Sequence, residues 1–303
     1  MPRARKRVLL AGIPAAAAVA VAVVLVTSGG GRPPRTTGWR QVLPSGSARI
    51  AEGPDGGSVW SVEIHNSFVS TSRRSYVYLP RYRPHVRFPA AYLLHGFPGS
   101  PFTFIRASRI AYVADHLIEA RELRPLIVVM PVAGRTLHYD GEWAGPWEKF
   151  VVDDVVPWTD AHLPTIAAAR GRAIGGLSAG GFGAVDIALR HLGLFSTAEA
   201  WAGYFHPLQD GPFRHAKRSE LLASDPTLLA ERFAPTLKRQ RVRIFLAAGI
   251  QDPVDVRRAQ DFSAELTRLG VDHVVVLRPG AHHESFWRRI LAPGLEYTFP
   301  GPG

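Results

Sequence analysis

Short apolar runs that alternate with longer helix-like segments do most to narrow the folds open to this chain. The apolar runs cover residues 60–65, 75–79, 90–94, 126–130, 173–177, 242–248 and 273–277. Segments with the apolar spacing of amphipathic helices lie at about 105–122, 147–163, 180–192 and 254–269. Alternation of this kind indicates an α/β fold, in which a mostly parallel central sheet carries helices on both faces.

The first 28 residues (1–28) have the pattern of a basic tail followed by a membrane anchor. Arg3, Arg5, Lys6 and Arg7 precede an uncharged, largely apolar stretch at 8–26. A helix needs about 20 such residues to cross a bilayer. A cleavable signal peptide has a shorter apolar core, so we favour an uncleaved transmembrane signal anchor, with cleavage and secretion as the alternative. The basic tail predicts that the rest of the chain lies outside the cytoplasm, attached to the cell membrane.

Composition divides the chain beyond the anchor and limits its partners. Residues 29–50 are rich in Gly, Pro and Ser, as in a flexible linker, whereas 51–298 has no comparable break and suits one α/β domain. The net charge is +11, but Lys and Arg form no block beyond the tail and no zinc or RNA-binding motif is present, so no nucleic-acid partner is expected. The absence of cysteine excludes disulfides, thiolate metal sites and a cysteine nucleophile.

The strongest chemical signal is a Gly-x-Ser-x-Gly sequence between an apolar run and a helix-like segment. It reads Gly176-Leu177-Ser178-Ala179-Gly180. At a strand-to-helix turn, this sequence forms a nucleophile elbow that presents the serine hydroxyl at the head of the helix. The alternative is a glycine-rich turn in which the serine only caps the helix. The flanking strand and helix favour Ser178 as a nucleophile.

A serine nucleophile needs a histidine base and an acid that orients this base, in the chain order serine, acid, histidine. His282 and His283 follow the last apolar run, at the edge where such sheets place their sites. Asp252 follows the preceding run, and Asp255 is its rival. We favour Asp252 as the acid, because Asp255 is suited to cap the helix that begins near Val256.

Two backbone N–H groups are expected to bind the oxyanion of the reaction. His95-Gly96 follows an early strand and is typical of a loop that supplies one of them. We assign this donor to Phe97, because Pro98 has no N–H. The second donor is the N–H of Ala179, directly after the nucleophile. The His95 side chain is expected to be structural.

Taken together, these segments resemble the Putative esterase family of α/β hydrolases, which includes esterase D and S-formylglutathione hydrolases, feruloyl esterases and secreted mycolyltransferases. The resemblance runs from about residue 61 to 291 and rests on SYVYLP (75–80), AAYLLHGFPGS (90–100), WEKFVVDDVVPWTD (147–160), GRAIGGLSAGGFGA (171–184), AAGIQDP (247–253) and GAHHESFW (280–287). The family's Gly-x-His, with Trp five residues later, matches Gly280, His282 and Trp287 and selects His282 over His283. Its Gly-x-x-Asp matches Gly249 and Asp252.

The resemblance implies an α/β-hydrolase fold and ester hydrolysis through an acyl-serine intermediate, without a metal or an organic cofactor. We therefore predict a serine carboxylesterase outside the cytoplasm, acting on a small-molecule ester or on a lipid or cell-envelope ester. An acyltransferase that uses the same three side chains with an alcohol acceptor is the alternative. A catalytically silent envelope-binding scaffold is disfavoured by the complete set of Ser178, Asp252 and His282. GEWAGPW (141–147) is a candidate aromatic rim of the pocket, and an irregular insertion around 200–240 is expected to cover it.

Overall fold

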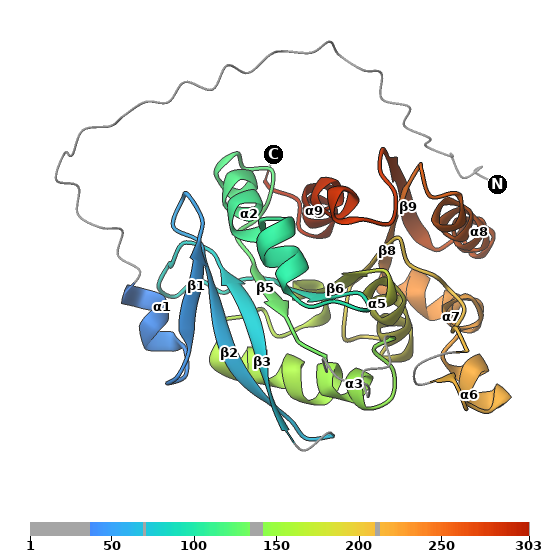
Figure 1. Cartoon of the computed structure of the whole chain (residues 1–303), viewed down its shortest axis with the longest axis horizontal. Helices are drawn as coiled ribbons and strands as arrows, with labels where there is room; N and C mark the ends of the chain where they lie inside the picture. The colour runs from blue at the N-terminus through green and yellow to red at the C-terminus, as the bar shows by residue number, and fades with distance from the viewer. Residues whose placement is uncertain (1–36, 69–70, 134–141, 210–212, 303) are drawn as a thin grey trace, which may run out of the picture. The chain divides into compact units, whose positions relative to one another are not determined.

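The computed structural model describes residues 37–68, 71–133, 142–209 and 213–302, all within one compact unit (Figure 1). The predicted anchor at 1–28 lies outside the described residues. Within the part of the chain that is described, no helix is both long and apolar enough to span a bilayer.

A nine-stranded sheet is the central layer of the described residues. The strands are β1 (Ala48–Glu52), β2 (Ser58–Asn66), β3 (Thr71–Leu79), β4 (Ala90–Leu94), β5 (Ile127–Met130), β6 (Arg172–Leu177), β7 (Thr197–Trp201), β8 (Arg243–Gly249) and β9 (Asp272–Arg278). Their spatial order is β1-β2-β3-β5-β4-β6-β7-β8-β9. The pairs from β1 to β5 are antiparallel, and the pairs from β5 to β9 are parallel. The predicted mostly parallel sheet is confirmed.

The burial of each strand explains its sequence pattern. Every residue of β4 (AAYLL) and β6 (RAIGGL) is buried, as expected for parallel strands covered on both faces. β2 (SVWSVEIHN) alternates buried and exposed residues over its second half, because one face of the antiparallel part meets solvent.

Helices cover both faces of the sheet. The α-helices are α1 (Thr37–Val42), α2 (Ile110–Glu119), α3 (Pro146–Lys149), α4 (Val156–His162), α5 (Ala179–Arg190), α6 (Arg218–Ala223), α7 (Pro226–Gln240), α8 (Pro253–Leu269) and α9 (Glu284–Thr298), and shorter helical turns are η1 (Thr103–Ala107), η2 (Phe150–Val155) and η3 (Ala169–Gly171). The apolar sides of α2 and α9 share one core cluster, and those of α5, α7 and α8 share the other. The two clusters use alternate residues of the same strands, which places them on opposite faces of the sheet.

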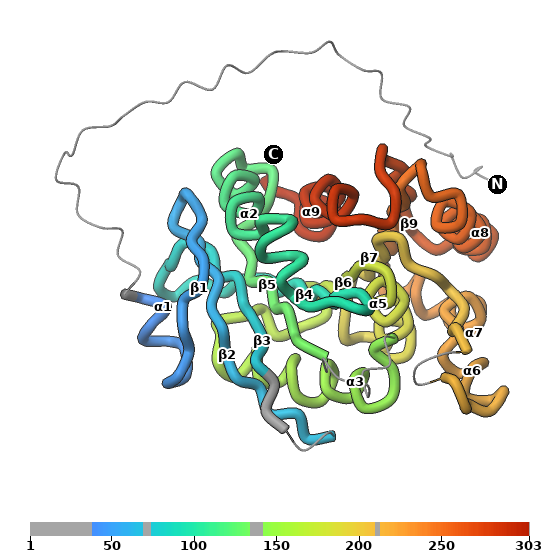
Figure 2. The backbone as a smooth tube through the Cα atoms, viewed as in Figure 1, coloured from blue at the N-terminus to red at the C-terminus, as the bar shows by residue number. Residues whose placement is uncertain are grey.

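The carboxyl ends of the central parallel strands meet at one edge of the sheet. The register pairs Leu94 at the end of β4 with Gly176 of β6, and Leu177 at the end of β6 with Trp201 at the end of β7. β8 and β9 end together at Gly249 and Arg278. Figure 2 shows β4, β6 and β7 side by side. The loops that leave these strands are therefore neighbours.

The predicted boundary between linker and domain needs correction, because part of 29–50 is folded. Residues 37–42 form α1, and β1 begins at Ala48. The Trp39 side chain is buried, its indole Nε1 donates to the Pro80 carbonyl oxygen at 2.7 Å, and its ring packs against Tyr82 and Phe88. The Gly-, Pro- and Ser-rich composition of this segment gave no indication that Trp39 anchors it to the folded domain.

The segment around 200–240 is also more regular than predicted. It contains α6 and the 15-residue helix α7. Asp225 caps α7 by accepting hydrogen bonds from the Thr227 and Leu228 N–H groups. The strand β7 (TAEAW), which the apolar pattern does not predict, precedes this segment.

Candidate active site

The Gly-x-Ser-x-Gly sequence forms the predicted sharp turn between β6 and α5. Ser178 lies between them with φ +56° and ψ −121°, a conformation that costs a non-glycine residue about 1–3 kcal/mol. Its N–H donates to the Trp201 carbonyl oxygen of β7 at 2.9 Å, and its own carbonyl accepts from Gly181 and Phe182 in the first turn of α5. The turn is thus held from both sides, and it projects the Ser178 side chain from the carboxyl edge of the sheet.

His282 faces this serine from the loop between β9 and α9. Its Nε2 is 2.9 Å from the Ser178 Oγ. The Trp287 ring of α9 packs edge-on against the imidazole, with ring centroids 5.1 Å apart. The neighbouring His283 is exposed and caps α9, since its ring accepts from the Ser285 N–H. The choice of His282 over His283 agrees with this geometry.

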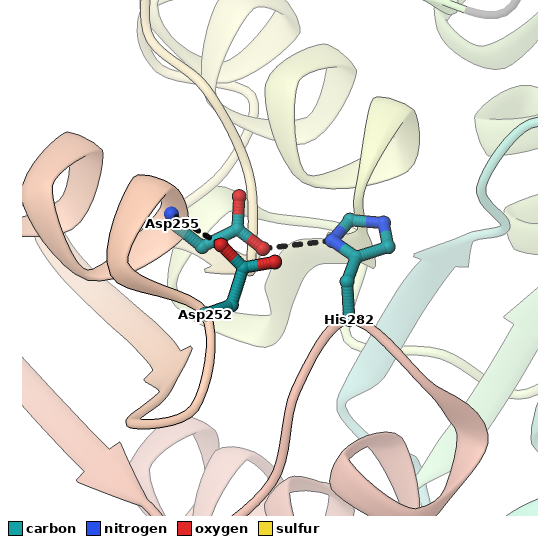
Figure 3. A group of neighbouring side chains, drawn as sticks. All are labelled: Asp252, Asp255 and His282. Carbon is teal, nitrogen blue, oxygen red and sulfur yellow. Dashed lines mark hydrogen bonds and ion pairs between the residues drawn. The ribbon is translucent and has the colours of Figure 1, made fainter.

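The carboxylate that contacts His282 belongs to Asp255, which corrects the assignment of Asp252. The His282 Nδ1 is 2.7 Å from the Asp255 Oδ2 (Figure 3). Asp252 is the N-cap of α8, and its Oδ1 accepts from the Val254 and Asp255 N–H groups at 3.1 Å each. Pro253 occupies the first turn of the helix, so the residue before it becomes the cap, and Asp255 is turned toward the imidazole one turn later.

Two hydrogen bonds form a continuous line from Ser178 through His282 to Asp255. This hydrogen-bonded line fixes the tautomer of His282. An ionised carboxylate can only accept, so Nδ1 carries the proton that it donates to Asp255, and Nε2 accepts from the Ser178 hydroxyl. The hydrogen bond to Asp255 raises the pKa of His282, and the charges of Asp255 and Asp252 raise it further. Burial of the imidazole acts in the opposite direction and lowers this pKa. Asp255 is buried, whereas the His282 side chain is 42% exposed. The line runs from the interior to the surface.

The loop after β8, which leads to Asp252 and Asp255, is hydrogen-bonded to the loop after β9, which carries His282 (the histidine loop). The Ile250 N–H donates to the Arg278 carbonyl, and the Gln251 N–H donates to the Gly280 carbonyl at 3.0 Å. The Gln251 Oε1 in turn accepts from the Gly280 N–H. A Cβ on Gly249 would lie 2.3 Å from the Gly280 carbonyl oxygen, so the two backbones touch there. These contacts set the position of His282 relative to α8.

The loop after β4 lies against the other side of the serine. A Cβ on Gly96 would lie 3.1 Å from the Ser178 Cβ, so this loop packs directly on the elbow. Phe97, with a side chain that is 55% exposed, follows in the same loop, and Ala179 begins α5. Both predicted oxyanion donors therefore come from segments that border Ser178. Their donor role stays a prediction.

His95 supports this loop from inside the protein. It is fully buried, and burial lowers its pKa to about 4. Its Nδ1 donates to the Gly96 carbonyl at 2.9 Å, while its Nε2 accepts from the Ala133 N–H at 3.2 Å. A neutral imidazole satisfies both bonds, so the geometry agrees with the structural role expected for His95.

Trp143 is a supporting residue whose role the sequence did not reveal. Its indole Nε1 donates to the His95 carbonyl at 2.9 Å, and its ring packs edge-on against the His95 ring. Trp143 and Trp147 are both buried, so they pack inside the protein and do not line a rim. The GEWAGPW sequence pointed to the right segment, but only tertiary contacts show that Trp143 holds the loop that contains Phe97.

An open cavity of about 540 Å³ lies beside the loop after β4. It is lined by Pro98, Gly99, Ser100, Phe102, Thr103, Arg106, Ala107 and Glu284. Glu284 is two residues from His282, and Pro98 is next to Phe97. The cavity is therefore lined by residues that are close in the chain to Phe97 and to His282.

One group of side chains in the described residues combines carboxylates and an imidazole closely enough to hold a cation. Asp252, Asp255 and His282 each offer a donor atom, and these atoms lie within 4.8 Å of one another. The group coincides with the hydrogen-bonded line, where the His282 Nδ1 already donates to Asp255. The contacts present are those of an acid–imidazole pair.

Comparison with known proteins assigns a family. A family model described as Putative esterase matches residues 67–298. An esterase of Mycobacterium tuberculosis is 32% identical over 152 residues, which cover 48% of this chain and 32% of that protein, so the chain spans about a third of the length of this relative. An acetyl esterase of Caldicellulosiruptor saccharolyticus is 25% identical over 228 residues, covering 68% of this chain and 81% of the relative.

Solved structures share the fold. A ferulic acid esterase superposes with a TM-score of 0.72 at 23% identity, over 80% of this chain and 98% of that one. An S-formylglutathione hydrolase from Staphylococcus aureus gives a TM-score of 0.65 at 19% identity, over 84% and 99% of the two chains. At these identities the likeness establishes an α/β-hydrolase-like fold.

Proposed function

This chain belongs to the Putative esterase family, and from that premise we propose that it is a serine carboxylesterase in which Ser178, His282 and Asp255 form the catalytic triad. The observation that carries the proposal is the continuous hydrogen-bonded line from the Ser178 Oγ through the imidazole to the Asp255 carboxylate. Three side chains far apart in the sequence meet there in the order that nucleophilic catalysis requires. Asp255 takes the role that the sequence had assigned to Asp252.

In the first half of the reaction, the serine is acylated. The Ser178 Oγ attacks the ester carbonyl carbon while its proton passes to the His282 Nε2, and the carbonyl π electrons move to the oxygen. The N–H groups of Phe97 and Ala179 stabilise this oxyanion. When the tetrahedral intermediate collapses, the bond to the alcohol oxygen breaks, and His282 returns its proton to the leaving alcohol.

In the second half, water releases the acid. His282 takes a proton from a water molecule, whose oxygen attacks the acyl-serine carbonyl, and then protonates the Ser178 Oγ as the acyl bond breaks. Asp255 stabilises the imidazolium formed in both halves through its hydrogen bond to Nδ1. The acid is buried, which strengthens this interaction relative to one in water.

The substrate and the location form part of the proposal. The cavity lies beside the loop after β4, which contains Phe97, and this supports binding of one arm of the ester there. The basic tail and apolar stretch at 1–28 support a catalytic domain attached to the membrane outside the cytoplasm, where small-molecule, lipid or cell-envelope esters are the available substrates.

Replacement of the nucleophile tests the proposal directly. We expect Ser178→Ala to lower kcat/KM for short-chain p-nitrophenyl esters by at least ~10³-fold while the folded state is retained. A fluorophosphonate probe should label the wild-type protein at Ser178 and leave the variant unlabelled. Unchanged turnover in Ser178→Ala would falsify the nucleophile, and a folded wild-type protein that resists the probe would favour the silent scaffold.

A further inference from the structure

The environment of the Asp255 carboxylate is not simply that of an acid beside a histidine. The Asp255 Oδ2 accepts from the His282 Nδ1, but its Oδ1 is 3.3 Å from the Arg258 Nη1, one turn further along α8. The guanidinium carries a full positive charge next to the acid. The Arg258 charge therefore offsets part of the negative potential that Asp255 presents to the imidazolium.

A second carboxylate lies in the same place. Donor atoms of Asp252, Asp255 and His282 lie within 4.8 Å of one another, and Figure 3 shows the Asp252 carboxylate directly beside that of Asp255. The Asp252 Oδ1 is occupied by the cap of α8. A cap does not need a charge, because Asn and Ser cap helices about as well as Asp. The negative charge at this position is thus available for another purpose.

We propose that Asp252 is a positioning residue for the reaction, whose carboxylate offsets the Arg258 guanidinium and so keeps the surroundings of the His282 imidazole net negative. This inference rests on the proposed function, since it assumes that His282 acts as the base. Asp252 does not replace Asp255 as the acid. It acts through space, while its cap holds the Asp255 N–H at the start of the helix.

The other groups around the imidazole do not supply this charge. Ser178 of the elbow faces Nε2, and Trp287 of α9 covers the ring edge; neither is charged. The hydrogen bond to Asp255 is the largest influence raising the pKa of His282, the charge of Asp252 raises it further, and Arg258 lowers it. Glu284, the next carboxylate along the chain, lines the cavity beside the loop after β4.

The test compares pH profiles of kcat/KM for Asp252→Asn and the wild type. Removal of the negative charge should move the ascending limb to lower pH and lower the plateau about threefold to tenfold, because the imidazolium is less stabilised. Adding Arg258→Gln to Asp252→Asn removes the unbalanced positive charge and should bring the limb back toward the wild-type position. Asp252→Ser, a second neutral cap, should behave like Asp252→Asn.

Asp225→Asn is the matched control. Asp225 caps α7 through hydrogen bonds to the N–H groups of Thr227 and Leu228 and also precedes a proline, but it lies outside the triad. This variant should leave the profile in place. An Asp252→Asn profile that overlays the wild type overturns the inference, as does a shift that Arg258→Gln fails to reverse. A wild-type protein with neither esterase activity nor probe labelling would instead contradict the proposed function.

Discussion

At the residue scale, Asp186 is an acidic side chain in the helix that follows Ser178. It lies within α5 and is fully buried. Neither of its carboxylate oxygens has a hydrogen-bond partner among the described residues, and the Arg190 Nη1 is 3.9 Å away. Burial raises the pKa of Asp186 to about 8, although the charge of Arg190 opposes this. At neutral pH the side chain is mostly protonated.

This pKa predicts how the stability of the protein depends on pH. The folded chain holds the Asp186 proton more tightly than the unfolded chain, so stability is lost as pH rises from about 4 toward 8. Asp186→Asn keeps the shape and cannot ionise. We expect it to be more stable than the wild type at pH 9, by on the order of a few kcal/mol, with a much smaller difference at pH 5. Thermal denaturation at both pH values measures this; equal Tm values at pH 9 would contradict it.

The exchange of roles between Asp252 and Asp255 shows what a sequence can decide at this scale. Both carboxylates follow the same strand, and spacing alone allows either to reach His282. Pro253 carries the missing signal, because proline at the first helical position makes the preceding residue the cap. Ser178 was easier to identify from its Gly-x-Ser-x-Gly sequence, whereas only the family's Gly-x-His pattern separated His282 from His283. The Arg258 contact with Asp255 joins positions i and i+3 of α8, so it is a local contact that the sequence spacing allows.

At the scale of elements, the paired loops after β8 and β9 determine how accurately the imidazole is placed. Gly249→Ala would put a Cβ 2.3 Å from the Gly280 carbonyl oxygen, so the histidine loop must move. We expect kcat to fall on the order of 10²-fold in a protein that still folds, because small displacements of a catalytic base are costly.

Gly193→Ala is the control for this substitution. Gly193 follows α5 at the end away from Ser178, and its φ of +87° makes alanine strained there, but a Cβ would meet nothing closer than 3.7 Å. It should lower Tm and leave kcat unchanged, as measured by calorimetry and ester hydrolysis. If Gly249→Ala matches this control in both measurements, the paired loops do not set the position of His282.

Among the parallel strands, the sequence predicted those that are apolar runs and missed β7, whose composition hides its burial. β4, β6 and β8 are apolar runs, so their place in the parallel sheet followed directly. β7 (TAEAW) contains Glu199, which is buried and bonded to Trp201 and to Thr298 of α9. A buried glutamate is tolerated only because those partners exist, and one lies almost a hundred residues away. No local pattern could predict that.

At the scale of the whole molecule, the N-terminal tryptophan tests where the folded unit begins. Trp39 is buried in the same core cluster as the parallel strands. Trp39→Ala should cost about 3–5 kcal/mol of unfolding free energy, because a large buried ring and its hydrogen bond to Pro80 are lost. Phe88, which it contacts, precedes β4 and so lies away from the catalytic edge. We expect kcat to be unchanged for the folded fraction. Denaturant titration measures the free energy of unfolding, and initial rates of ester hydrolysis measure kcat. If Trp39→Ala is as stable as the wild type, this segment is a linker after all.

In the proposed triad, exposure to solvent drops sharply between the His282 imidazole and the Asp255 carboxylate, and this has a chemical consequence. The imidazole is nearly half exposed, whereas the Asp255 carboxylate is almost completely enclosed. A reagent that arrives from water meets the nucleophile and the base but never their acidic partner. Under the proposed mechanism, inactivators therefore act at the exposed end, on Ser178 or His282, whereas reagents that modify carboxylates spare Asp255.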